Sequence, residues 1–246
     1  MEFGKFRKYD SDIFHAITDR YGGVSQKPYD SLNLALHVGD EVKDVLENRI
    51  RVSKKYDFSI KNLIFMDQVH GNNIAVIEDA MDNRMADCDA LITSERKIPL
   101  MAMVADCIPI LFYDPIKKVI AVAHAGRNGT FLRIAPKTVL KMQEVYGCVA
   151  QDIMIGLGAS IRSCCYEVGK DLADICTKNF GEGFIMIEDE KYFLDLQALN
   201  LAQLLEIGVK KENIEISSIC TACDDNYFSY RREGETGRFA GFIMIR

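Results

Sequence analysis

The sequence predicts a single α/β domain that spans residues 1–246. Short apolar runs of about four to six residues, rich in Val, Ile, Leu and Met, each end at a polar residue or a glycine, as is typical of buried strands. Longer segments with apolar residues at helical spacing lie between them. No internal repeat, low-complexity segment or linker divides the chain, and 48% hydrophobic residues provide an ample core. One α/β domain is therefore the simplest interpretation.

The first half of the chain is expected to form mainly strands, at 14–18, 63–66, 74–77, 91–93, 99–104 and 119–123. The segment 21–36, with two glycines and a proline, is expected to be irregular. A helix that carries Asn48 and Arg49 follows it, with Asp40 as the expected N-cap. The apolar face of this helix is expected to hold Val42, Val45, Leu46, Ile50 and Val52.

The second half alternates helices and strands. A long helix is expected to begin beyond Thr130, near Pro136, and to end at Gly147, because proline suits a first helical turn and glycine a C-terminus. Further helices are expected at 169–179 and 195–206, the second capped by Asp195. Strands are expected at 153–157, 214–219 and 239–245, with a polar loop at 221–237.

Composition excludes several classes of function. The net charge of −6 argues against nonspecific nucleic-acid binding. The first residues lack the apolar region of a secretory signal, and no apolar run is long enough to span a membrane. We therefore expect a cytoplasmic protein without nucleic-acid or membrane partners. Its eight cysteines are then expected to be thiols, metal ligands or nucleophiles rather than disulfides.

Three of the expected strands lead into residues that bind metals. His70 follows the run 63–66, Cys107 follows 99–104, and His124 follows the run that ends at Ala123. A catalytic zinc site has three protein ligands and one open position, and both imidazole and thiolate are good zinc ligands. Because α/β proteins place their chemistry at the C-terminal edges of strands, we expect these side chains to meet and to hold one zinc ion.

The same residues support a second chemistry. Cys107 and a neighbouring histidine would form a nucleophile–base pair, with Asp106 or Gln68 orienting the imidazole. The residues alone leave this alternative open.

Other motifs receive simpler interpretations. The CTAC segment from Cys220 to Cys223 resembles half a zinc knuckle, but no second CxxC or nearby histidine pair accompanies it. We interpret these cysteines as ordinary reduced thiols, and the adjacent pair Cys164 and Cys165 as packing residues. The GxG at 156–158 is an incomplete dinucleotide-binding pattern and is rejected. Arginines are good anion ligands, and candidates for phosphate are Arg49, Arg231, Arg232 and Arg238.

An ordered series of motifs, from about residue 29 to 245, resembles the laccase-domain family, also labelled multicopper polyphenol oxidoreductase. The series is NLALHVGD, ENR, QVHG, ADCDALIT, ADCIPILFYD, HAGRNGT, CCYEVG and FSYRREGETGR. The resemblance implies a single-domain α/β sandwich with a mixed sheet core. It also implies a zinc-dependent purine nucleoside phosphorylase that acts on adenosine, inosine, guanosine or methylthioadenosine and that deaminates adenosine.

The resemblance assigns roles to individual residues. It implies that the residues of QVHG, ADC and HAG that bind zinc are His70, Cys107 and His124. It places Arg49, the arginine of ENR, at a catalytic position, and His37 of HVGD in a motif typical of the family.

One motif departs from the family pattern. The family usually has HAGWRG where this chain has HAGRNG, so Arg127 replaces a tryptophan and Asn128 an arginine. We expect Arg127 and Asn128, together with His37 and Arg231, to contact the nucleoside or phosphate. The substitutions leave the implied zinc ligands in place.

The laccase label itself conflicts with the small number of histidines in the chain. A multicopper oxidase needs on the order of ten histidines, since imidazole is the preferred ligand of its copper ions. The chain has four histidines, so copper is expected only as an adventitious replacement for zinc. Two alternatives to the phosphorylase remain: a Cys–His hydrolase or amidase that edits cell-wall precursors, and a non-catalytic zinc-binding regulatory protein.

Overall fold

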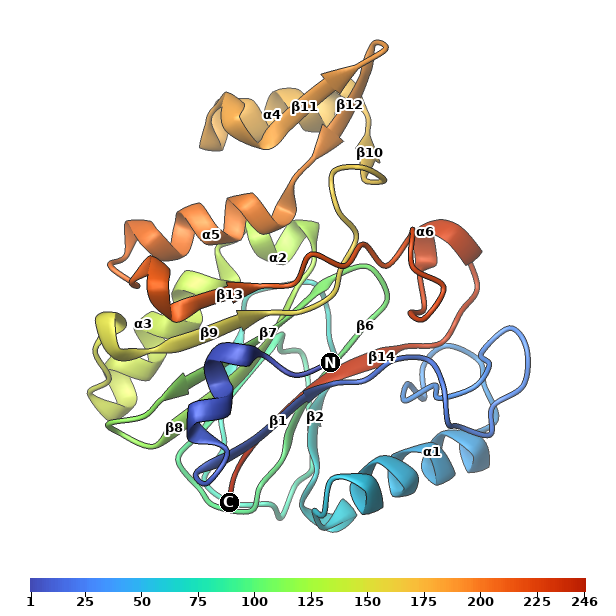
Figure 1. The fold of residues 1–246 in the computed structure, drawn as a ribbon, viewed down its shortest axis with the longest axis vertical. Helices are drawn as coiled ribbons and strands as arrows, with labels where there is room; N and C mark the ends of the chain where they lie inside the picture. The colour runs from blue at the N-terminus through green and yellow to red at the C-terminus, as the bar shows by residue number, and fades with distance from the viewer.

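The computed structural model describes residues 1–246, and its centre is a pair of mixed β-sheets packed face to face (Figure 1). The five-stranded sheet has the order β1 (Ile13–Ile17), β14 (Phe239–Ile245), β6 (Leu100–Val104), β2 (Ile64–Met66) and β4 (Arg84–Met85). The six-stranded sheet has the order β13 (Ile214–Ile216), β9 (Met154–Leu157), β7 (Ile108–Asp114), β8 (Val119–Ala125), β5 (Ala90–Thr93) and β3 (Ile74–Val76). Each sheet contains both parallel and antiparallel pairs.

Both sheets are buried on both faces. Along β7, Leu111 and Tyr113 lie in the core between the sheets, whereas Ile110 and Phe112 pack on the opposite face. Successive side chains of a strand point to opposite faces, so a strand covered on both sides must be apolar at every position. This is the physical reason why these strands appear in the sequence as uninterrupted apolar runs.

Helices cover the two outer faces and complete the sandwich. The outer face of the five-stranded sheet packs against α1 (Val42–Lys55), while α3 (Ile134–Tyr146) and α5 (Leu196–Glu206) pack on the six-stranded sheet. Figure 1 shows α1 on one side of the strands and α3 and α5 on the other. The expected α/β sandwich with a mixed sheet core is confirmed. No helix combines the length and apolar character that crossing a membrane requires.

A smaller layer projects beyond the sandwich at the top of Figure 1. It contains α4 (Lys170–Phe180) and a sheet of order β10 (Glu167–Val168), β12 (Lys191–Leu194) and β11 (Ile185–Glu188). The sequence predicted α4 but not the hairpin of β11 and β12. Most side chains of β11 are exposed, so this strand lacks the apolar pattern that marks a buried one.

The structure corrects the expected start and face of α1. Glu41, not Asp40, is the N-cap residue, and it makes no capping hydrogen bond. The Asp40 carboxylate instead accepts hydrogen bonds from Ser25 Oγ at 2.6 Å and Asn33 Nδ2 at 2.8 Å. Val42 and Leu46 are exposed, while polar side chains of α1 are buried against the segment before it. Hydrogen bonding to that segment, rather than apolar contact alone, therefore determines which face of α1 is buried.

The central region contains two elements that the sequence analysis missed. Strand β7 was not expected, and a short helix, α2 (Arg127–Phe131), precedes α3. Arg133 adopts a left-handed conformation between α2 and α3, which ends the first helix and starts the second. The long helix α3 begins at Ile134, beyond Thr130 as expected, and Pro136 lies in its first turn. The short helix α2 before it was not predicted. The short helix α6 (Tyr230–Glu233) lies inside the expected polar loop.

Candidate active site

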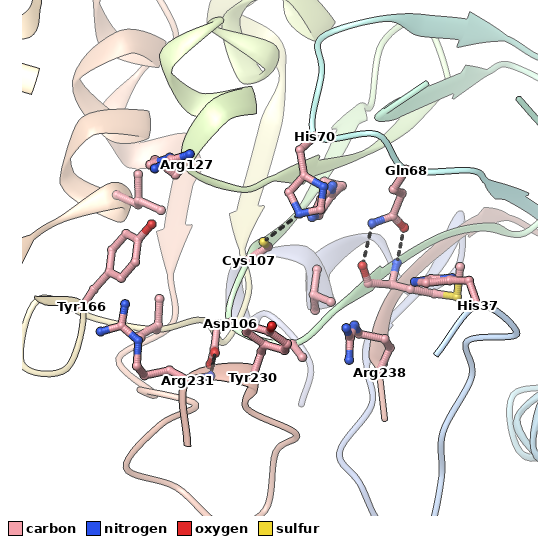
Figure 2. A pocket seen from close by; sticks show the side chains of 16 residues that line it. His37, Gln68, His70, Asp106, Cys107, Arg127, Tyr166, Tyr230, Arg231 and Arg238 are labelled. Carbon is pink, nitrogen blue, oxygen red and sulfur yellow. Dashed lines mark hydrogen bonds between the residues drawn. The ribbon is translucent and has the colours of Figure 1, made fainter. Parts of the chain in front are cut away.

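His70, Cys107 and His124 meet where the two sheets come together. His70 follows β2, Cys107 lies in the turn between β6 and β7, and His124 belongs to β8. Cys107 Sγ lies 4.0 Å from His70 Nε2, and the two imidazole rings are 4.6 Å apart in an edge-to-face arrangement. One donor atom from each residue falls within 4.8 Å of the others. Figure 2 shows His70 and Cys107 facing each other. The three residues therefore form a compact set of metal-binding donors.

A buried carboxylate organises two of these donors. Asp89 is fully buried, and its Oδ1 lies 2.8 Å from His124 Nδ1. The same carboxylate accepts hydrogen bonds from the backbone N–H groups of His70 and Gly71 at 3.0 and 2.7 Å. An Nδ1–H donor to Asp89 leaves the Nε2 lone pair of His124 free to bind a metal, an arrangement typical of metal-ligating histidines.

The charge of the site favours the thiolate form of Cys107. Burial acts to raise the pKa of this thiol, but the positive charge and hydrogen bonds of His124 and His70 outweigh burial and lower the pKa to about 6. A metal ion bound here would displace the protons of the imidazoles, and a thiolate with two neutral imidazoles is a good donor set for zinc.

Gly126 keeps the space beside these donors open. A Cβ atom at this position would lie 2.9 Å from Cys107 Sγ and 3.1 Å from His70 Cδ2. Real Cβ atoms essentially never approach another atom as closely as 2.9 Å. The lack of a side chain at Gly126, the glycine of the HAG motif, therefore permits this close approach. Backbone conformation does not require glycine here, because a φ of −76° is available to any residue.

A cavity of about 510 Å³ opens from the three donors. Three arginines, Arg127, Arg231 and Arg238, line it together with Tyr166 and Tyr230. Figure 2 shows Arg127 and Tyr166 on one side of Cys107 and Arg238 on the other. The cavity thus combines candidate metal-binding donors at its floor, cationic groups suited to an anion, and aromatic rings suited to a planar group.

The arginines differ in their freedom to bind a ligand. The Arg231 guanidinium donates to the carbonyl oxygens of Cys165 and Glu167 at 3.0 and 3.1 Å. Arg238 donates to the carbonyl oxygens of two neighbouring residues. The Arg127 side chain lines the cavity, and its guanidinium makes no hydrogen bond or ion pair within the protein. It is therefore the cation most available to a bound anion.

Three of the other expected site residues, Arg49, Asn128 and Arg232, lie outside the cavity lining. Arg49 is buried behind Met103, with Nε donating to the Leu34 carbonyl at 2.9 Å and its guanidinium 4.2 Å above the Phe65 ring. Asn128 Nδ2 donates to the His70 carbonyl at 2.7 Å and so holds the loop that carries this histidine. Arg49 and Asn128 are absent from the cavity lining, whereas His37 belongs to it. Arg232 also lies outside it and donates to loop carbonyls.

The orienting group for histidine was wrongly assigned from sequence. Both oxygens of Asp106 are occupied, by Thr221 Oγ1 and by the backbone N–H of Arg231, each at 2.7 Å. Gln68 pairs with the backbone N–H and carbonyl of Met103. Asp89 performs the orienting role instead. It lies in the quoted motif ADCDALIT, but nothing in its local pattern distinguishes it from the neighbouring acidic residues.

Comparisons with known proteins match the chain to one group of related proteins. A family model described as multi-copper polyphenol oxidoreductase laccase matches residues 14–246. A purine nucleoside phosphorylase of Corynebacterium glutamicum is 38% identical over 231 residues, which cover 93% of each chain. The crystal structure of YlmD from Geobacillus stearothermophilus aligns with a TM-score of 0.90 at 34% identity, over 95% of this chain and 92% of that one.

A second solved structure, of the hypothetical protein YfiH from Bacillus licheniformis, aligns with a TM-score of 0.91 at 31% identity over 98% of this chain and 94% of that one. In Bacillus subtilis, the relative named purine nucleoside phosphorylase YlmD is 31% identical over 259 residues, covering 100% of this chain and 93% of that protein. The chain therefore belongs to the multi-copper polyphenol oxidoreductase laccase family.

Proposed function

We propose that this protein is a zinc-dependent purine nucleoside phosphorylase that cleaves adenosine, inosine, guanosine and methylthioadenosine with phosphate, and that it also deaminates adenosine. The observation that supports this proposal most strongly is the arginine-lined cavity directly above His70, Cys107 and His124. The names of the relatives support it independently, because several are purine nucleoside phosphorylases.

The donor set fits zinc. Two imidazoles and one thiolate surround a space that Gly126 keeps open, and three protein ligands leave one coordination position free. A bound zinc ion supplies Lewis acidity at the floor of the cavity, next to the substrate. Any copper at this site would be an adventitious replacement for zinc. A multicopper cluster needs on the order of ten histidines. The chain has four, and one of them, His15, lies elsewhere and accepts a hydrogen bond from the Phe3 backbone N–H.

Arg127 is the proposed principal ligand of phosphate. Its guanidinium is free, and planar N–H donors match the oxygens of a phosphate group. Arg238 on the opposite side of Cys107 contributes further positive charge. Holding phosphate and nucleoside together supplies much of the rate enhancement for a two-substrate reaction, because the entropy of association is lost on binding rather than in the chemical step.

The aromatic side chains provide the proposed site for the purine. Tyr166 and Tyr230 line the cavity, and planar rings favour stacking on aromatic groups. His37 at the rim is a weak source of a proton at neutral pH, because burial and the nearby charge of Arg238 lower its pKa.

Product analysis with inosine tests the proposal. Zinc-loaded protein is expected to release hypoxanthine only when phosphate is present, and to form ribose 1-phosphate in equal amount.

The Cys–His hydrolase is favoured by one feature, the low pKa of Cys107. It predicts amide hydrolysis that is independent of phosphate and abolished by thiol alkylation. A regulatory protein would bind zinc and convert no nucleoside.

Asp89→Asn is expected to weaken zinc binding by about 10- to 100-fold, the usual effect of removing a partner that orients a metal-bound histidine. The asparagine would present an N–H₂ group where the carboxylate now accepts hydrogen bonds from His124 and from the loop of His70. Competition with a chromophoric chelator measures the affinity. Asp114→Asn is the matched control, because Asp114 is a buried carboxylate at the C-terminal end of β7, the end away from Cys107. Equal affinities in wild type and Asp89→Asn would contradict the orienting role.

Arg127→Ala is expected to raise the KM for phosphate by roughly 10-fold or more, because removal of a charged hydrogen-bond donor costs about 1.5–3 kcal/mol. Zinc content should be unchanged, and adenosine deamination, which consumes no phosphate, should suffer much less. Arg51→Ala on α1, where the arginine pairs with Glu47, is the control. Equal losses in both reactions would show that Arg127 supports the cavity as a whole, and an unchanged KM would place it outside the phosphate site.

A further inference from the structure

Four cysteines outside the candidate active site converge from two distant segments. Cys164 and Cys165 lie in the turn after β9, and Cys220 and Cys223 lie in the turn after β13. The two strands are parallel neighbours, so their C-terminal ends reach the same edge of the sheet. An isolated parallel β-bridge between Ser160 and Cys220 extends the strand pairing beyond β9 and β13, up to the cysteine-containing turns. The fold therefore supplies the second cysteine pair that the CTAC segment lacks in the sequence.

The sulfur atoms have the spacing of ligands around a single ion. Cys164 Sγ lies 3.8 Å from both Cys165 Sγ and Cys223 Sγ, and Cys165 Sγ lies 3.2 Å from Cys223 Sγ. All four sulfur atoms fall within 4.8 Å of one another. Tetrahedral zinc with Zn–S bonds of ~2.3 Å separates its sulfur ligands by ~3.8 Å.

Hydrogen-bonded turns hold the sulfur atoms in place. Within CTAC, the Cys220 carbonyl accepts from the N–H groups of Cys223 at 3.1 Å and Asp224 at 2.9 Å. In the other turn, the Arg162 carbonyl accepts from Cys165 N–H, while Arg162 N–H donates to Cys220 Sγ at 3.4 Å. An N–H donor to sulfur stabilises a thiolate and is the kind of supporting contact that orients a metal ligand.

We propose that Cys164, Cys165, Cys220 and Cys223 form a structural zinc site, separate from the site at His70, Cys107 and His124. Four thiolates complete a closed tetrahedral coordination shell, which leaves no open position for substrate. Soft thiolate ligands in this geometry select zinc over magnesium, calcium or manganese.

This site connects two segments of the cavity wall. Tyr166 directly follows Cys165 and lines the cavity. Arg231, from the segment that follows Cys223, donates through its guanidinium to the Cys165 carbonyl and lies with Cζ 5.3 Å from the centre of the Tyr166 ring. Zinc at the four cysteines would fix the positions of Tyr166 and Arg231 without contacting substrate.

Metal analysis of variants tests the proposal. Wild-type protein purified from zinc-supplemented cells is expected to contain about two zinc ions per chain, one in each site. Cys223→Ser and Cys164→Ser should each lower the content to about one, because a three-thiolate remnant binds zinc more weakly. Cys176→Ala, which removes a buried thiol of α4 outside both sites, should leave it unchanged.

Cobalt provides a second readout that does not depend on the serine variants folding. In Cys107→Ala protein, the four-cysteine cluster is the remaining thiolate site, so bound Co²⁺ should show intense sulfur-to-metal charge-transfer absorption. Zinc content unchanged in both serine variants, or Co²⁺ without this absorption in Cys107→Ala protein, would overturn the proposal. So would iron in place of zinc, or a Cys165–Cys223 disulfide in protein that holds only one zinc.

Discussion

Cys107→Ala is expected to remove the zinc of the candidate active site and to lower kcat/KM for inosine phosphorolysis by more than about 100-fold. Loss of a residue that only orients a metal ligand usually costs about 10- to 100-fold, and loss of a ligand itself should cost more. Cys107 supplies the one thiolate of this donor set, and two imidazoles alone do not complete a catalytic zinc site. Metal analysis and steady-state kinetics on the same preparation measure both effects.

Secondary structure should survive this substitution. The protein has an extensive core on both faces of its sheets, so folding does not depend on the metal as it does in a zinc finger. Cys176→Ala again serves as the control for loss of a buried thiol. A Cys107→Ala protein that keeps the wild-type zinc content would show that the assigned ligands are wrong. A folded variant that loses zinc yet keeps full activity would separate the metal from catalysis.

Gly126→Ala is expected to be nearly as damaging, although it adds a single methyl group. The new Cβ would lie 2.9 Å from Cys107 Sγ and 3.8 Å from His124 Nε2, so at least one metal donor must move. Catalytic groups displaced by about 1 Å commonly cost on the order of 100-fold in rate. We expect a loss of this size in kcat/KM, together with weaker zinc binding.

The backbone at this position makes the experiment specific. Gly126 has an ordinary φ of −76°, so alanine introduces crowding at the donors rather than backbone strain. Gly183→Ala is the matched control, because a Cβ at that position meets nothing within 4 Å. Unchanged kinetics and zinc affinity in Gly126→Ala would show that the metal site tolerates a shift of its donors and would refute the steric role.

Several strands and the three donors were accessible from sequence because each is marked locally, whereas β7 was not predicted although it too is buried at every position. Strands such as β8 and β14 are buried on both faces and therefore form continuous apolar runs. His70, Cys107 and His124 follow or end such runs, so the edge of the sheets where they meet could be inferred. The expectation of a single domain over residues 1–246 stays a prediction.

The remaining features depend on contacts between distant segments. Asp89 acts on His124 and on the loop of His70 through hydrogen bonds that no local pattern encodes. Asn48 is buried on α1 because it donates to Ser25 Oγ and the Asn33 carbonyl on the preceding segment. Sequence periodicity describes apolar packing well and says little about such polar pairings.

The four-cysteine cluster illustrates the same limit. Cys164 and Cys220 lie far apart in the chain, and only the parallel pairing of β9 with β13 brings their turns together. Considered one pair at a time, the cysteines lack partners, and the sequence predicts ordinary reduced thiols. Interpreted in the fold, they have the spacing of a complete ligand set, which raises the expected zinc content from about one to about two per chain.

The two residues that depart from the family motif take different positions at the site. Asn128 Nδ2 donates to the His70 carbonyl and lies outside the cavity lining, so it contacts the loop of a proposed metal ligand rather than the cavity. Arg127 lines the cavity, so a guanidinium is present there although the arginine of the usual motif is replaced by Asn128. The change from tryptophan and arginine to Arg127 and Asn128 thus keeps a cation at the site.

The most direct test of the account measures inosine phosphorolysis as zinc is returned to chelator-treated protein. The account predicts no hypoxanthine release from metal-free protein and none without phosphate. With phosphate, the rate should rise as zinc fills the site of His70, Cys107 and His124, with equal yields of hypoxanthine and ribose 1-phosphate. Full activity in protein shown to contain no metal, or equally fast release of hypoxanthine without phosphate, would contradict it.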